Sequence, residues 1–110
     1  MGSFCENQTT LIGYIVLPPE QISDQPIGVR TRLATNEVFY SNKFKRLTTQ
    51  SEYHNLKIWN QNARFALDNL KVGDKIYTLG KIHYNEISTE DHKLIKIPEI
   101  IVLKLIKLGN

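Results

Sequence analysis

Hydrophobic and polar positions alternate along most of the first sixty residues, with the period of two that is typical of β-strands. Residues 9–17 are rich in β-branched and aromatic side chains and predict a first strand. Pro18 and Pro19 are expected to end it, because proline cannot donate to a strand ladder, and residues 18–28 have the composition of a connecting turn. Alternation resumes over residues 29–40, which predicts a second strand.

A third strand is predicted over residues 52–60, after a polar, basic, hairpin-like loop at residues 41–51. One face of this strand is an ordinary core face, with His54 beside Leu56 and Ile58. The other face places an amide and a lysine between two large aromatic rings, in the order Tyr53, Asn55, Lys57 and Trp59. A solvated strand normally shows small or charged residues instead, so this face is the first candidate for a binding surface.

The hydrophobic period changes to about 3.6 after residue 60. Apolar residues at i, i+3, i+4 and i+7 predict one face of a short helix, formed by Ala63, Ala66, Leu67 and Leu70. Asn60 or Asn62 can cap its start, Lys71 suits its last turn, and Gly73 suits its end.

Two further strands follow the predicted helix. Residues 75–85 alternate again, and residues 87–93 form a polar turn. Residues 99–107 are apolar on both faces for most of their length, which indicates a strand that packs on both sides. Pro98 sets the earliest start of this strand as a central strand of a sheet.

The order of three strands, one short helix and two strands is that of the OB-fold, a five-stranded β-barrel of the all-β class whose helix lies between strands three and four. We therefore predict a single OB-fold domain over residues 9–110, preceded by a flexible segment at residues 1–8. Since this barrel binds oligonucleotides in some proteins and oligosaccharides in others, the fold alone does not give the function.

Composition agrees with one small folded domain. The 110 residues are 41% hydrophobic and 23% charged, and the formal net charge of +3 is compatible with a polyanionic partner without proving one. The single cysteine, Cys5, has no partner for an internal disulfide, which favours a reducing compartment. No apolar run approaches ~20 residues, so no membrane span is predicted.

The sequence offers no constellation of catalytic or metal-ligating residues. His54, His83 and His92 share no ligand-like spacing, and no glycine-rich phosphate loop is found. The carboxylates of the second half are scattered as solvated side chains usually are, at Asp68, Asp74, Glu86, Glu90 and Asp91. We predict a binding module rather than an enzyme, without metal, cofactor or small-molecule substrate.

Cations and aromatic rings gather around the predicted hairpin between strands two and three. The cations are Arg30, Arg32, Lys43, Lys45, Arg46 and Lys57, and the rings are Phe39, Tyr53 and Trp59. Aromatic rings interleaved with cations suit stacking of unpaired bases, with phosphates held beside them. Two plainer interpretations stay open: the basic tip is simply solvated, or Tyr53 and Trp59 are covered by another part of the chain or by a partner subunit.

Five motifs in register resemble the bacterial and mitochondrial single-stranded DNA-binding proteins. In chain order they are Leu11-Ile12-Gly13-Tyr14-Ile15, Leu33-Ala34-Thr35-Asn36-Glu37, Glu52-Tyr53-His54, Lys71-Val72-Gly73-Asp74-Lys75-Ile76-Tyr77 and Gly80-Lys81-Ile82. Val72 departs from the fourth motif. Each motif is weak singly, but together they cover roughly residues 9–108.

The resemblance implies particular roles for residues at the matching positions. Base-stacking aromatics fall on Phe39, Tyr53 and Trp59, and the cations named above would neutralise phosphates. A fourth stacking position falls on Ile87, and three basic positions fall on His83, Asn85 and Asn55. The chain thus resembles the family with a thinner cationic track. Members of the family form homotetramers, and this implies an oligomer interface that includes His54 and Tyr77.

The function expected from these features is sequence-independent binding of single-stranded DNA in support of replication and repair. The short C-terminus resembles the mitochondrial branch, so we expect a mitochondrial matrix or nucleoid location, with the bacterial cytoplasm as the alternative. A second hypothesis keeps the fold and changes the partner, to RNA or to a protein within a nucleic-acid-processing assembly.

Overall fold

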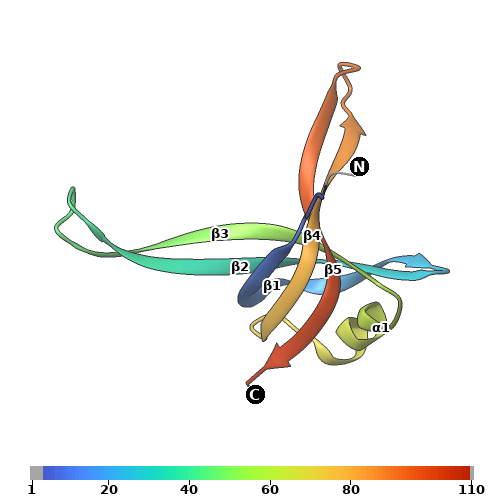
Figure 1. Cartoon of the computed structure of the whole chain (residues 1–110), viewed down its shortest axis with the longest axis horizontal. Coiled ribbons are helices and arrows are strands. Elements are labelled where there is room, and N and C mark those ends of the chain that lie inside the picture. The colour runs from blue at the N-terminus through green and yellow to red at the C-terminus, as the bar shows by residue number, and fades with distance from the viewer. Residues whose placement is uncertain (1–3, 110) are drawn as a thin grey trace.

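The computed structural model describes residues 4–109 and shows five strands closed into a barrel, with one short helix between the third and fourth strands (Figure 1). Around the barrel the strand order is β1-β2-β3-β5-β4. The elements are β1 (Thr9–Asp24), β2 (Ile27–Ser41), β3 (Arg46–Trp59), α1 (Asn60–Asn69), β4 (Lys75–Ser88) and β5 (Leu94–Leu108). The predicted all-β OB-fold architecture is confirmed.

The barrel closes through β1, which pairs antiparallel with β4 through residues 9–14 and with β2 from Tyr14 onward. On the opposite side β3 and β5 run parallel over three residue pairs only, Leu56–Ile58 against Ile100–Val102. The core consists of the inward-facing residues of the strands and the inner face of the helix: Ile15, Val29, Leu33, Leu56, Ile58, Ala63, Ala66, Leu70, Ile76, Ile100 and Val102.

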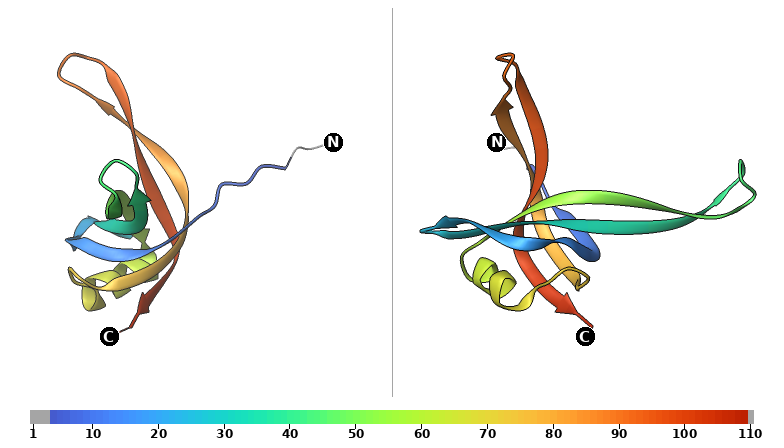
Figure 2. Two further views of the ribbon diagram at one scale, coloured as in Figure 1. Left: turned by 90° about the vertical axis from the view of Figure 1, so that its left-hand side faces the viewer. Right: turned by 180° about the vertical axis from the view of Figure 1, so that it is seen from behind.

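Two long hairpins extend beyond the barrel as separate arms (Figures 1 and 2). One arm is the β2–β3 hairpin, which stays paired without a register shift from Gly28–Trp59 to Ser41–Arg46. The other arm is the β4–β5 hairpin, which is paired out to Ser88–Leu94. The predicted loop at residues 41–51 is therefore wrong in length, since β3 already begins at Arg46. In the arm both faces meet solvent, so the outer part of β3 carries no apolar alternation by which the sequence pattern would show a strand.

The predicted end of the first strand at Pro18 is also wrong, because β1 continues to Asp24. The ladder between β1 and β2 is irregular here, with register shifts between Ile15 and Leu17 and between Leu17 and Glu20. A bulge leaves residues of one strand unpaired, so prolines at these positions remove no ladder hydrogen bond. This irregular half of β1 forms one side of the cavity described below.

The last strand likewise begins earlier than predicted, at Leu94 rather than after Pro98. Up to Pro98 its partner is β4 (Tyr84 pairs with Pro98), and β3 joins only at Ile100. Pro98 therefore lies in a two-stranded arm, at the edge position where proline is tolerated.

The prediction that the last strand packs on both sides is wrong for the single chain. Val102 is buried in the core, but Leu103 and Ile106 are 61% and 42% exposed. The outer surface of β5 therefore carries apolar side chains that this chain itself does not cover.

The helix α1 packs through Ala63 and Ala66, both fully buried, as the spacing predicts. The predicted asparagine cap is wrong: Trp59 is the N-cap and makes no side-chain capping hydrogen bond, while Asn60 is the first helical residue. The Asn62 side chain instead donates to the carbonyl of Leu103 on β5 (3.3 Å). No helix within residues 4–109 is long and apolar enough to cross a membrane.

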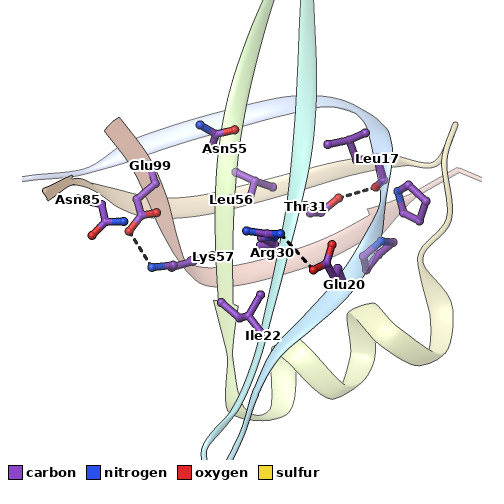
Figure 3. A pocket seen from close by; sticks show the side chains of 12 residues that line it. Leu17, Glu20, Ile22, Arg30, Thr31, Asn55, Leu56, Lys57, Asn85 and Glu99 are labelled. Atoms are coloured by element: carbon purple, nitrogen blue, oxygen red, sulfur yellow. Dashed lines mark hydrogen bonds and ion pairs between the residues drawn. The ribbon is translucent and has the colours of Figure 1, made fainter. Parts of the chain in front are cut away.

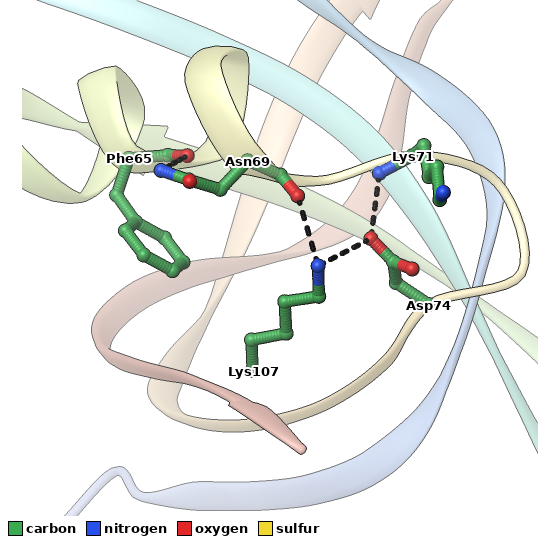
Figure 4. Close-up of polar contacts among 5 residues, drawn as sticks. All are labelled: Phe65, Asn69, Lys71, Asp74 and Lys107. Atoms are coloured by element: carbon green, nitrogen blue, oxygen red, sulfur yellow. Dashed lines mark hydrogen bonds and ion pairs between the residues drawn. The ribbon is translucent and has the colours of Figure 1, made fainter. Parts of the chain in front are cut away.

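Lys71 lies beyond the helix end rather than in its last turn, and the buried carboxylate of Asp74 holds this connection (Figure 4). The Asp74 side chain accepts from the Lys71 backbone N–H (2.9 Å) and forms an ion pair with Lys107 (3.6 Å). The Lys107 ammonium also donates to the Asn69 carbonyl, one of the orphan carbonyls of the helix end (3.3 Å). These contacts tie the helix to the C-terminal strand.

Of the predicted flexible segment at residues 1–8, residues 1–3 lie outside the described part of the chain, and residues 4–8 form neither helix nor strand. Asn7 is nevertheless anchored on β4. Its side-chain amide donates to the carbonyl of Ile82 (2.8 Å), and its side-chain oxygen accepts from the Ile82 N–H (2.9 Å).

Candidate nucleic-acid interface

The pairing of β2 with β3 brings the cations and rings singled out from the sequence onto one surface. Arg30 lies opposite Lys57, Arg32 opposite Asn55, Ala34 opposite Tyr53, and Gly28 opposite Trp59. Directly opposed residues of an antiparallel pair share a face, and the register does not shift. We call this surface the Tyr53 face and define it by Arg30, Arg32, Tyr53, Asn55, Lys57 and Trp59.

Tyr53 is an open aromatic ring of this face, with 58% of its surface exposed. The guanidinium carbon of Arg32 lies 5.6 Å from the centre of the Tyr53 ring, within the distance of a cation–π contact. The interpretation that the chain itself covers Tyr53 is therefore wrong. An exposed ring with a cation beside it is the arrangement that stacks a base and holds its phosphate.

Trp59 is only half-exposed because its indole lies against the backbone of Gly28. A Cβ atom added at Gly28 would come within 2.4 Å of Cζ3 of the indole. Trp59 also borders a small cavity of about 490 Å³ at the start of α1. One side of the indole is thus used within the fold.

Two cations of the Tyr53 face are already paired with carboxylates. The Lys57 ammonium lies 3.2 Å from Glu99, whose side chain is only 10% exposed. Arg30 lies 3.1 Å from Glu20, with both side chains more than 60% exposed. An exposed pair of this kind contributes about 0–1 kcal/mol and opens easily, so Arg30 is more readily available to a phosphate than Lys57.

The remaining predicted cations, Lys43, Lys45 and Arg46, lie at the exposed tip of the β2–β3 arm. The charged ends of Lys43 and Arg46 lie 5.4 and 5.6 Å from the centre of the Phe44 ring. Tyr53 lies about 23 Å from Arg46 along β3, at roughly 3.3 Å per residue. The arm therefore carries a second group of cations around an aromatic ring.

Phe39 is not brought onto the Tyr53 face. It pairs with Thr48, and strand alternation places it on the opposite face of the arm together with Thr35 and His54. Tyr40, opposite Leu47 and 57% exposed, lies on the Tyr53 face instead. The sequence already contained this signal, because Tyr40 has the same parity as Arg30 and Arg32.

The two predicted interface residues lie apart from the Tyr53 face. His54 is half-buried, and its Nε2 atom lies 2.9 Å from the Thr35 hydroxyl oxygen. Tyr77 lies on β4 between Ile12 of β1 and Ile106 of β5. Ile12 and Ile106 are 52% and 42% exposed, so Tyr77 stands in an apolar outer surface of the barrel.

A cavity of about 840 Å³ opens beside the Tyr53 face, between the irregular half of β1 and the strands β3 and β5 (Figure 3). Sequence reasoning did not single out its buried carboxylate, Glu99, although a lone acid within an apolar strand was a visible signal. Within residues 4–109 no group of three or more His, Cys, Asp or Glu residues could hold a metal ion. We call the cavity of about 840 Å³ the Glu99 cavity. Its lining residues are Leu17, Pro18, Pro19, Glu20, Ile22, Arg30, Thr31, Asn55, Leu56, Lys57, Asn85 and Glu99.

Four positions that are basic or base-stacking in the family are occupied by other residues in this chain. They lie near this cavity and on the β4–β5 arm. Asn55 and Asn85 line the cavity, and His83 pairs with Glu99 on the neighbouring strand. Ile87 lies farther out on the arm opposite Ile95. Neutral amides in place of cations leave the cavity wall polar but not strongly basic.

Two solved protein structures and one family model resemble this chain over nearly its whole length. A solved structure, described as a Plasmodium falciparum SSB in complex with ssDNA, is 25% identical in sequence with a TM-score of 0.85, and the match covers 99% of this chain and 100% of that one. A small single-stranded DNA-binding protein from Streptomyces coelicolor has a TM-score of 0.75 and is 18% identical, over 94% and 95% of the two chains, which supports the fold. No curated protein sequence matches the chain.

The model of the single-strand binding protein family matches residues 6–108. This range includes all five strands, the helix and every residue of the Tyr53 face. The match is therefore to the whole barrel and not to one motif. The chain belongs to the single-strand binding protein family.

Proposed function

We propose that this protein binds single-stranded DNA without marked sequence preference, by stacking bases on aromatic rings and neutralising phosphates with nearby cations. The observation that carries the proposal is the Tyr53 face, where an exposed ring and the Arg32 guanidinium lie 5.6 Å apart on an open two-stranded arm. Membership of a family of binding proteins agrees with the absence of enzymatic activity expected from the sequence.

The path of the bound strand follows the β2–β3 arm. Bases stack on Tyr53 and on the open side of Trp59, and Tyr40 offers a further ring on the same face. Phosphates meet Arg32 on this face and the cations around Phe44 at the tip. Arg30 joins them once its exposed pair with Glu20 opens, whereas Lys57 is paired with the less exposed Glu99 and does not contact this part of the phosphate backbone.

Titration of the intrinsic fluorescence of Trp59, the only tryptophan, with oligo(dT) tests this proposal. We expect quenching, because a base stacked on the indole changes its surroundings. We also expect affinity to fall with salt. Five phosphates neutralised by Arg30, Arg32, Lys43, Lys45 and Arg46 correspond to a slope of roughly −3.5 in log K against log salt, at about −0.7 per phosphate.

A folded protein that shows neither quenching at low salt nor a shift of labelled oligo(dT) in a gel would overturn the DNA proposal. Oligo(U) titrated in parallel separates DNA from RNA, because stacking alone is indifferent to the sugar. Tighter binding of oligo(U) than of oligo(dT) would favour the RNA alternative.

We further propose that the protein assembles as a homotetramer. Residues 9–13 of β1 pair only with β4 among the described residues, which leaves one strand edge open. The apolar outer surface around Ile12, Tyr77 and Ile106 lies beside this edge. Exposed strand edges and apolar patches are surfaces that proteins cover by association. Light scattering is expected to give a mass about four times the 12.7 kDa of one chain, and a monomer mass would contradict the proposal.

We also propose a role in DNA replication and repair within mitochondria, with the bacterial cytoplasm as the alternative location. It is supported by the resemblance of the five sequence motifs to the bacterial and mitochondrial proteins. A fluorescently tagged protein that fails to co-localise with organellar DNA in its source cells would remove the mitochondrial part.

A further inference from the structure

The Glu99 cavity has one apolar wall that suits the flat surface of a base. This wall comes from the irregular half of β1 and consists of Leu17, Pro18, Pro19 and Ile22 (Figure 3). Leu17 and Ile22 are 50% and 37% exposed, although both are large and apolar. A volume of about 840 Å³ lies within the range of about 300–1,000 Å³ that is usual for small-ligand sites.

The opposite wall is polar, and one of its groups lacks a hydrogen bond. The Glu99 side chain is 10% exposed and faces the Lys57 ammonium at 3.2 Å. The buried Oε1 atom of Glu99 has no hydrogen-bond partner of good geometry, and the Lys57 ammonium neutralises its charge as an ion pair. A ligand can reach Oε1 only where the Lys57 ammonium moves aside, and N–H groups of the ligand would then replace that ion pair.

Other polar groups of the cavity are also available. Among the residues drawn in Figure 3, hydrogen bonds and ion pairs join Glu99 to Lys57, Arg30 to Glu20, and Thr31 to Leu17, and none involves Asn55 or Asn85. Both amides carry donors and acceptors. The cavity therefore contains a carboxylate, an ammonium and two amides that can form hydrogen bonds with a ligand.

The cavity adjoins the expected path of the DNA. Asn55 and Lys57 follow Tyr53 by two and four residues on the same face of β3. They lie about 7 and 13 Å farther along the strand, at roughly 3.3 Å per residue. A chain of nucleotides stacked on Tyr53 therefore passes the cavity, and one base can turn into it.

We propose that the Glu99 cavity receives one guanine base of the bound strand. The Glu99 carboxylate would accept hydrogen bonds from N1–H and the N2 amino group, and Lys57 would donate to O6. Guanine is the only one of the four bases with two adjacent N–H donor groups on its Watson–Crick edge, and a carboxylate accepts such a pair through both oxygens. This inference rests on the proposed function, because the base reaches the cavity as part of a DNA strand bound to the Tyr53 face.

The test compares oligo(dT) with the same oligomer carrying a single guanine at its centre. The single substitution avoids self-association of guanine-rich DNA. We expect the guanine oligomer to bind about fivefold to tenfold more tightly, the lower end of the range for a bidentate base contact, because Lys57 must be shared between Glu99 and the base. Adenine at the same position is the control for the stronger stacking of a purine, and we expect it to give less than half of this gain.

A modified base tests the contact without changing the protein. N1-methylguanine keeps the purine ring and O6 but lacks the N1–H donor, so it should keep only the stacking gain and bind no more tightly than adenine. On the protein side, Glu99→Gln keeps the size of the side chain and is expected to remove the guanine preference. Glu37→Gln, an equal change of charge on the opposite face of the arm, should preserve the preference.

The outcomes separate this inference from the proposed function. Equal affinity of the wild-type protein for the guanine, adenine and thymine oligomers would overturn the guanine site and leave DNA binding intact. A guanine preference that survives both Glu99→Gln and N1-methylation would also overturn it. If no oligomer binds at all, both the proposed function and the site are wrong.

Discussion

Replacing Tyr53 by alanine is expected to weaken the binding of oligo(dT) by about fivefold to 150-fold, the equivalent of about 1–3 kcal/mol for one stacked base. The Tyr53 ring is 58% exposed, so its removal leaves no cavity in the core and the fold should remain unchanged. Fluorescence anisotropy of labelled oligo(dT) measures the loss, and circular dichroism checks the fold.

Tyr53→Phe is the matched control for this experiment. It keeps the ring and its position beside Arg32 and removes only the hydroxyl, so affinity should stay within about twofold of the wild type if stacking is what binds the base. Equal affinities of the alanine and phenylalanine variants would show that Tyr53 does not stack a base, whatever the family resemblance implies.

Replacing Gly28 by alanine is expected to lower the free energy of unfolding by about 1–3 kcal/mol, the usual cost of an extra methyl group in a packed site. The new Cβ would lie 2.4 Å from Cζ3 and 2.8 Å from Cε3 of the Trp59 indole, so the ring has to move. Denaturant unfolding measures the loss, and a shift in the emission of Trp59 reports the movement of the ring.

A double-mutant cycle with Trp59→Phe isolates this contact. The atoms that the new methyl group would meet belong to the six-membered part of the indole, and phenylalanine places a smaller ring there. Gly28→Ala should therefore cost clearly less stability in the Trp59→Phe background, with a coupling of about 0.5–3 kcal/mol. Full additivity would mean that the indole does not lie against Gly28 in solution.

Most of the fold was predictable because the barrel is built from elements with a clear local signal. The period of two along residues 29–40 and the change to 3.6 at Ala63 and Ala66 predicted a strand and a helix that the structure confirms. The wrong strand boundaries lie where tertiary pairing allowed residues that local propensity excludes from strands. Pro18 and Pro98 lie inside strands, because a bulge and a two-stranded arm leave positions at which no ladder hydrogen bond is required of them.

The candidate site was predictable to the extent that it depends on alternation along single strands. Residue parity placed Tyr53, Lys57 and Trp59 on one face of β3, and the pairing with β2 adds Arg30 and Arg32. The same rule, applied to the second strand, would have preferred Tyr40 to Phe39, which the family resemblance selected by position. Local pattern and resemblance therefore disagree at this one ring.

The sequence by itself determined which side chains share a strand face, because that depends only on backbone geometry over a few residues. It also determined the family, through motifs spread over the whole chain. Only the tertiary structure decided which charges are free: Glu99 meets Lys57 because β5 runs beside β3, and that pairing occupies a cation which the pattern counted for DNA. The Glu99 cavity likewise depends on the tertiary structure, because strands that are distant in sequence form its walls and no local sequence pattern predicts that they pack together.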